Sequence, residues 1–221
     1  MEYLILGHGG APVLVFPTSN GRCWQWEDFS MVASLRRHLD NGWAQLFCVD
    51  SVDREALYNH EAEPGERLAR QAAYEAYILE EFLPILRQEN PVDYLIVTGT
   101  SFGAYHAVNF SLRHPDVVHR VIAMSGDYCI RKYLDDHYDL DAYFNCPVDY
   151  LPNLTDAWYL ERYRNRLDII LATSDWDFCL GPTLRLSEIL ERLGVPHFLD
   201  VWGDHLTHDW PAWKRMIQKF L

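Results

Sequence analysis

The sequence lacks any apolar run of the roughly 18–20 residues that a helix needs to cross a bilayer. It is also poor in basic residues, with 19 lysines and arginines against 32 aspartates and glutamates and a formal net charge of −13. Phosphate backbones and anionic lipid surfaces repel such a chain, so neither a nucleic acid nor a membrane is an expected partner. The first 20 residues show no basic segment followed by an apolar one, so no secretory signal is predicted and a cytoplasmic location is expected.

Cysteine is scarce, odd in number and widely spaced. None of the five cysteines forms a Cys-x-x-Cys pair, which predicts a reduced protein without a structural zinc site. The phosphate-binding pattern G-x-x-x-x-G-K-[ST] is absent, and the glycine-rich residues 7–10 precede an expected strand, so nucleotide binding is not predicted. His205 and His208 stand three residues apart in an expected loop, which is weak evidence for a metal site. No metal and no cofactor are therefore expected.

The composition suits one globular domain over residues 1–221, because 49% of the residues are hydrophobic and 23% are charged. Short β-like runs are expected at 3–6, 12–16, 45–49, 93–98, 117–124, 167–172 and 197–202. Helices are expected at 65–88, 104–114, 182–193 and 210–221. The glycine-rich residues 8–10 predict a hairpin between the first two strands. The alternation predicts the α/β class, with a mostly parallel central sheet covered by helices on both faces.

One segment, residues 127–166, does not follow this alternation. It is rich in tyrosine, aspartate and asparagine, contains Pro147 and Pro152, and shows no clear strand. It lies between two sheet strands, on the side where loops carry function in open α/β sheets. We expect a small irregular cap or insertion over the site, with Asp127 and Tyr128 at its start binding substrate.

The most informative motif is G-x-S-x-G at residues 99–103. The apolar run before it predicts a strand, and the stretch after it predicts a helix, which is the setting of a nucleophilic serine. Ser101 would sit at a sharp corner with its hydroxyl clear of the backbone. Gly99 and Gly103 lack a Cβ, so strand and helix can approach each other closely there.

A serine hydroxyl needs an imidazole to take its proton and a carboxylate to orient that imidazole. In α/β-hydrolases the chain order is serine, acid, histidine, and this chain offers that order. Asp177 follows an expected strand by a few turn residues and is the preferred acid, with Asp175 as the alternative. His208 lies just before the last helix and is the preferred base, with His205 as the alternative. The other histidines are expected to be surface or packing residues.

The oxyanion hole of such an enzyme needs two backbone N–H groups aimed at the developing negative charge. The residue after the nucleophile, Phe102, is expected to supply one of them. The loop after an early strand, residues 17–22, is expected to supply the other through Thr18 or Ser19.

These motifs resemble a known group, the "putative esterase" branch of the α/β-hydrolase superfamily, which includes esterase D-like enzymes, enterochelin-esterase-like enzymes and the antigen 85 mycolyltransferases. The resemblance covers nearly the whole chain in order. It rests on residues 16–19, 48–53, 99–103, 124–126 and 208–213. It implies a Ser–Asp–His serine hydrolase without a cofactor, in which the histidine before the tryptophan, His208, is the base. The acid of the family sits in a short turn after its strand, which suits Asp177.

The main functional hypothesis is a cytoplasmic serine esterase that cleaves a small-molecule carboxylic ester through an acyl-enzyme. A second hypothesis is acyl transfer with the same triad, in which an alcohol replaces water. A third is a non-catalytic hydrolase fold that only binds a ligand, since a fold alone does not fix a function.

Overall fold

The structure, a computed structural model, describes all residues 1–221. Its centre is a seven-stranded sheet with strand order β1-β3-β2-β4-β5-β6-β7. The strands are β1 (Tyr3–Leu6), β2 (Ala11–Phe16), β3 (Ala44–Val49), β4 (Ile96–Thr100), β5 (Arg120–Met124), β6 (Asp168–Trp176) and β7 (Phe198–Thr207). Only β1 runs antiparallel to its neighbour. The predicted α/β class with a mostly parallel sheet is confirmed.

The predicted hairpin between the first two strands is wrong. β1 and β2 do not pair, because β3 lies between them and takes Leu4 and Val15 as neighbours of its Cys48. All six residues of β3 are buried. Such a strand has no polar face or open edge to leave in water, so it takes a place inside the sheet and separates the two strands that precede it.

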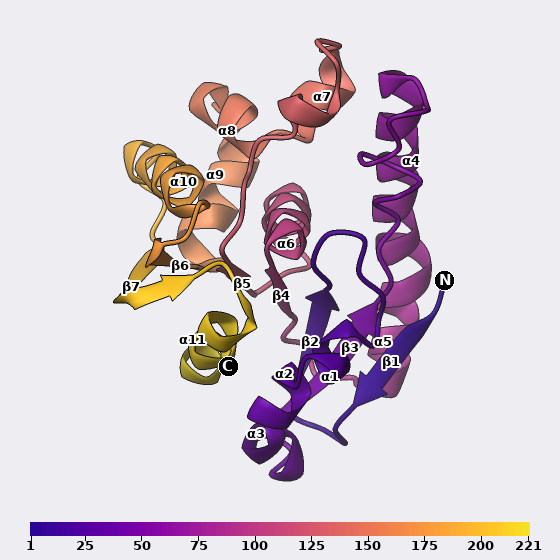
Figure 1. Cartoon of the computed structure of the whole chain (residues 1–221), viewed down its shortest axis with the longest axis vertical. Coiled ribbons are helices and arrows are strands. Elements are labelled where there is room, and N and C mark those ends of the chain that lie inside the picture. Colours follow the sequence, from indigo (N-terminus) through magenta and orange to yellow (C-terminus); the bar gives the residue numbers. More distant parts are fainter.

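Helices cover both faces of the sheet (Figure 1). On one face lie α1 (Gln25–Asp28), α2 (Met31–Ser34), α3 (Arg36–Asp40) and α11 (Trp210–Phe220). On the other lie α4 (Pro64–Ala76), α5 (Leu83–Glu89), α6 (Phe102–Arg113) and α10 (Leu180–Arg192). The side chains of β2 show how the sheet divides the core, since Val13 and Val15 join one cluster while Leu14 and Phe16 join the other. No helix combines the length and apolar character that crossing a bilayer requires.

The helix expected over 65–88 forms with one irregularity. A π-helical turn, η1 (Tyr77–Phe82), separates α4 from α5. Pro84 explains it, because a proline inside a helix removes an N–H donor and its ring collides with the carbonyl four residues earlier. The widened turn accommodates that ring while the apolar face continues through Ile78, Phe82 and Leu86, which are buried.

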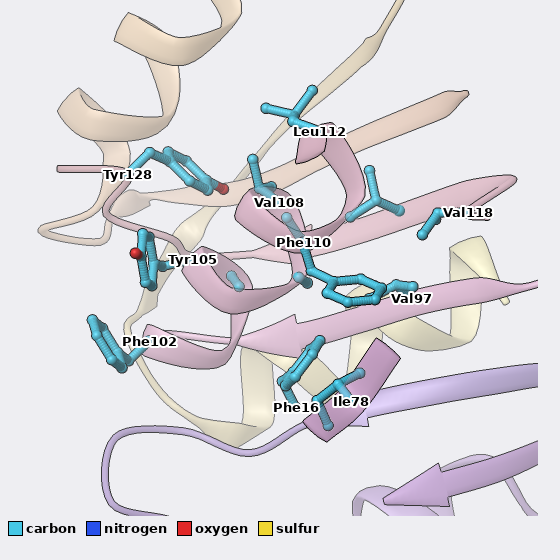
Figure 2. Packing of buried hydrophobic residues seen from close by; sticks show 14 of the residues in the cluster. Phe16, Ile78, Val97, Phe102, Tyr105, Val108, Phe110, Leu112, Val118 and Tyr128 are labelled. Atoms are coloured by element: carbon cyan, nitrogen blue, oxygen red, sulfur yellow. The ribbon is translucent and has the colours of Figure 1, made fainter. Parts of the chain in front are cut away.

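Residues 127–166 are more helical than expected. They contain α7 (Leu140–Phe144), α8 (Pro147–Tyr150) and α9 (Ala157–Asn165), with 3₁₀ turns η2 (Arg131–Tyr133) and η3 (Leu151–Asn153). Proline at the start of α8 and aspartate N-caps at α7 and α9 supply the start signals that the composition obscured. Side chains of the segment join the same core as α6, and Figure 2 shows Tyr128 beside that helix.

Candidate active site

Ser101 stands where β4 ends and α6 begins. Its backbone has φ 57° and ψ −121°, a conformation that a serine adopts only where the surrounding chain enforces it. Two backbone hydrogen bonds hold Ser101 in this conformation: its N–H donates to the Met124 carbonyl at 2.9 Å, and its carbonyl accepts from the Ala104 N–H at 3.0 Å. The corner therefore holds the hydroxyl away from the sheet.

The two glycines of the motif are required by close backbone contacts. A Cβ on Gly99 would lie 2.1 Å from the Gly103 carbonyl oxygen, and a Cβ on Gly103 would lie 2.3 Å from the Pro17 carbonyl oxygen. Gly103 thus brings the first turn of α6 against the loop that follows β2. This contact sets the distance between Ser101 and residues 17–21.

We predict that Gly103→Ala destabilises the fold, although replacing a helical glycine by alanine ordinarily stabilises by up to about 1 kcal/mol. The added Cβ must displace backbone, so the free energy of unfolding should fall by about 2–4 kcal/mol. Urea denaturation measures it. Gly181→Ala in the first turn of α10 is the matched control, since its Cβ meets nothing within 4 Å. A destabilised Gly181→Ala with a stable Gly103→Ala would contradict this account.

Three side chains from three strand ends meet beside this corner. The Ser101 hydroxyl Oγ lies 2.8 Å from His208 Nε2, and His208 Nδ1 lies 2.8 Å from Asp177 Oδ1. Asp177 follows β6, and His208 follows β7 just before α11, whose N-cap is Asp209. Parallel neighbours β4, β5, β6 and β7 end at the same edge of the sheet, which is why residues 107 positions apart touch here.

The Asp177 carboxylate is buried, with a side-chain exposure of 0%. Burial raises its pKa, but His208, the nearby Ser125 hydroxyl and the Cys179 N–H outweigh that effect, so the pKa lies below its ordinary value. The Cys179 N–H donates to Oδ1 at 2.8 Å, so this one oxygen accepts hydrogen bonds from both Cys179 and His208. The group is therefore an anion aligned with the imidazole.

The alternative acid and base lie elsewhere. Asp175 Oδ2 and His205 Nδ1 are 3.7 Å apart and pair with each other, and His205 is 69% exposed. β6 and β7 run longer than expected, to Trp176 and Thr207, with a register shift near their ends. This extension places the Asp175–His205 pair on the projecting strand ends, with no contact to Ser101.

Sequence reasoning missed the groups that surround the imidazole. The Trp213 ring meets the His208 ring edge-on at a centroid distance of 5.0 Å, and its Nε1 donates to Ser125 Oγ at 2.9 Å. The Phe178 ring lies 4.0 Å from that of His208 and is 75% exposed. Trp213 and Ser125 lay within motifs noted in the sequence, but nothing there signalled their mutual contact. Phe178 carried no signal beyond adjacency to Asp177.

The backbone N–H groups predicted to form the oxyanion hole differ in whether they already donate a hydrogen bond within the chain. Phe102 opens α6, where backbone N–H groups have no partner within the helix. The Thr18 N–H donates to Gln25 Oε1 at 2.8 Å. The Ser19 N–H makes no hydrogen bond within the chain, and its side chain is held by Tyr58 through an Oγ–OH contact of 2.8 Å. Of the two residues predicted from this loop, Ser19 has the free donor.

The two predicted substrate-binding residues differ as well. Asp127 is partly exposed and accepts from Lys132 Nζ at 2.8 Å. Tyr128 is completely buried, and its ring fills the space beside Gly126. The expectation for Tyr128 is therefore corrected, because a side chain packed in the core has no surface to offer a substrate.

One group of side chains has the proximity of metal ligands: Asp177, Cys179 and His208. Asp177 and His208 already bond to each other, and burial raises the pKa of the Cys179 thiol to about 12. A protonated thiol is a poor ligand, so this donor set does not fit a metal.

Comparison with known families decides the relationship. A family model described as "Putative esterase" matches residues 48–219. The chain belongs to this esterase family. It is accordingly a carboxylic ester hydrolase, and the resemblance of its motifs to the putative-esterase group is confirmed. No protein of curated function matches the sequence.

Solved structures share the fold at low sequence identity. A ferulic acid esterase has a TM-score of 0.75 and 18% identity, over 99% of this chain and 90% of that one. The S-formylglutathione hydrolase FrmB of Staphylococcus aureus has a TM-score of 0.70 and 15% identity, over 96% and 80%. The fluorophosphonate-binding serine hydrolase FphF of the same organism has a TM-score of 0.67 and 17% identity, over 96% and 82%. At these identities the likeness concerns the fold.

Proposed function

We propose that this esterase cleaves small-molecule carboxylic esters through a covalent acyl-enzyme on Ser101. His208 Nε2 takes the hydroxyl proton as Oγ attacks the ester carbonyl carbon, and Asp177 stabilises the imidazolium that results. The carbonyl oxygen becomes an oxyanion, which the Phe102 and Ser19 N–H groups stabilise. The carbon–oxygen bond to the alcohol then breaks, and His208 returns the proton to the leaving alcohol.

The second half repeats these roles with water. His208 takes a proton from water, whose oxygen attacks the acyl carbon of the ester on Ser101. The tetrahedral species collapses, Ser101 Oγ leaves with the proton from His208, and the carboxylic acid is released. The proton transfers between Ser101 and His208 use Oγ and Nε2, which lie within hydrogen-bond distance at 2.8 Å.

The observation that carries the proposal is the unbroken contact from Ser101 Oγ through His208 to Asp177, with both distances at 2.8 Å. A packing serine would have no need of a strained φ, a base within reach and a buried anion behind that base.

The test is covalent trapping. A fluorophosphonate should label the protein at one site per chain, and peptide mapping should place the label on Ser101. p-Nitrophenyl acetate should give a burst of one nitrophenol per labelled site if deacylation is slower than acylation. A label on another residue, or none at all, would refute the proposal. Product analysis in added methanol separates the alternatives, since a transferase would form mainly methyl ester.

A further inference from the structure

Residues 50–60, which follow β3, hold the loop of residues 17–21 at two adjacent points. Asp53 Oδ2 accepts from the Asn20 N–H at 2.7 Å, and the Tyr58 hydroxyl contacts Ser19 Oγ at 2.8 Å. Asn20 has φ 55°, a left-handed conformation that side-chain-bearing residues rarely adopt. The loop therefore keeps its shape through contacts from outside rather than through its own preference.

The second oxygen of Asp53 reaches α6. Its Oδ1 lies 2.9 Å from His106 Nε2, and the two side chains are 0% and 3% exposed. Gln71 of α4 places its Nε2 3.4 Å from His106 Nδ1. With Gln71 donating to Nδ1, the imidazole carries its proton on Nε2 and donates it to Asp53. The buried carboxylate thus receives one donor from α6 and one from the loop.

His106 also contacts Phe102, the residue on α6 whose N–H is the other candidate oxyanion donor. It lies one helical turn after Phe102, and the two rings meet edge-on at a centroid distance of 4.8 Å. Phe102 and Phe16, both labelled in Figure 2, lie on the face of the sheet that α6 covers, and His106 contacts both rings. The Asp53 carboxylate therefore joins two parts of the candidate oxyanion hole: through His106 it bonds α6, which carries the Phe102 N–H, and through Asn20 it bonds the loop that carries the Ser19 N–H.

We infer that Asp53 and His106 are positioning residues that fix the separation of the Ser19 and Phe102 N–H groups. The inference rests on the proposed acyl-enzyme chemistry of Ser101. Oxyanion donors help only when they are held about 2.7–3.1 Å from the place where the charge develops. A displacement of about 1 Å can cost up to 10²-fold in rate. Neither residue touches the reacting atoms, so both act through the loop.

The chain offers a matched control for this inference. His114, at the far end of α6, lies 2.6 Å from Glu75 in a similar histidine–acid contact. A merely structural role for the His106 pair would resemble that of the His114 pair, which contacts neither the loop nor Ser101. Comparing variants of the two pairs therefore distinguishes a contact that only stabilises the fold from a contact that also positions the oxyanion donors.

The experiment compares His106→Asn with His106→Gln. The shorter side chain can still bond Gln71 but does not reach Asp53, whereas the longer one can place its Nε2 near that of the imidazole. Sites are counted by fluorophosphonate labelling, so each kcat for p-nitrophenyl acetate refers to folded, reactive molecules. His106→Asn should lower kcat by about 10- to 100-fold with KM within about twofold. His106→Gln should recover most of the loss, and His114→Asn should retain the kcat of the wild type.

Binding of phenylboronic acid supplies the readout that a structural role would not move. Its tetrahedral adduct on Ser101 places an oxygen where the oxyanion forms, so its Ki should rise in His106→Asn by the factor that kcat falls.

An unchanged kcat per site in His106→Asn, or equal losses in His106→Asn and His114→Asn, would overturn the inference. If that variant does not fold, Asp53→Asn decides, since its single oxygen cannot accept from both donors. A wild-type kcat there would also overturn it. Failure to label Ser101 would instead refute the proposed chemistry.

Discussion

Replacing Ser101 by alanine is expected to lower kcat for ester hydrolysis by about 10⁴-fold or more, because it removes the atom that forms the acyl-enzyme. The oxyanion donors would remain, and they account for a residual rate above that of water alone. The fold should survive, since alanine meets the same backbone strain at φ 57° as serine and is smaller. The measurement is the steady-state rate with an aryl ester, alongside urea denaturation of both proteins.

His208→Ala and His205→Ala provide the controls for this prediction. The first removes the base 2.8 Å from Oγ and should match Ser101→Ala in its loss. The second removes an exposed histidine that pairs with Asp175, so its rate should stay within about twofold of the wild type, as surface changes away from a site usually do. Equal rates for wild type and Ser101→Ala would exclude a nucleophilic role, and a larger loss in His205→Ala would assign the base to the other histidine.

The fold was predictable where periodicity and chain order suffice. The largely apolar runs within 45–49 and 93–98 indicated strands, which form as β3 and β4, and helical stretches between strands indicated parallel connections. The pairing of β1 was not predictable, because its two candidate partners, β2 and β3, are both almost entirely apolar. Only the completed sheet shows that β3 must lie inside it. The helices of residues 127–166 were also missed, since their apolar face is complete only against α6 and α10.

The candidate site was predictable to the extent that strand ends determine it. Ser101, Asp177 and His208 all follow strands of one parallel sheet, so their approach could be expected from order along the chain. The choice between Thr18 and Ser19 depends on Gln25, which takes the Thr18 N–H. The role of His106 depends on a residue 53 positions away. Such contacts leave no periodic pattern in a sequence.

Asp177→Ala is expected to lower kcat by about 10⁴-fold, while Asp177→Asn should lose only about 10- to 100-fold. An amide that turned its NH₂ toward Nδ1 would force the wrong imidazole tautomer, at a cost of about 10⁴ in kcat. Here the Cys179 N–H and His208 Nδ1 both point at Oδ1, so the carbonyl of the introduced amide can take that place and accept from both. Its NH₂ then replaces Oδ2, which makes no hydrogen bond in the native chain, although the nearby Ser125 hydroxyl helps to lower the pKa of the carboxylate. What the Asp177→Asn variant loses is charge, and a charged hydrogen bond exceeds a neutral one by about 1–2 kcal/mol.

Asp175→Asn is the matched control, since that carboxylate is partly exposed and pairs with His205.

The free energy of unfolding measured as a function of pH gives an independent check. Because the pKa of folded Asp177 is lowered, its stabilising contribution is complete above the pKa of the unfolded carboxyl, about 4. That contribution disappears as the pH falls through the lower folded pKa. The stability gap between wild type and Asp177→Asn should therefore be constant near neutrality and narrow only in acid. Equal kcat losses in the Ala and Asn variants would show that Oδ1 does not orient the imidazole.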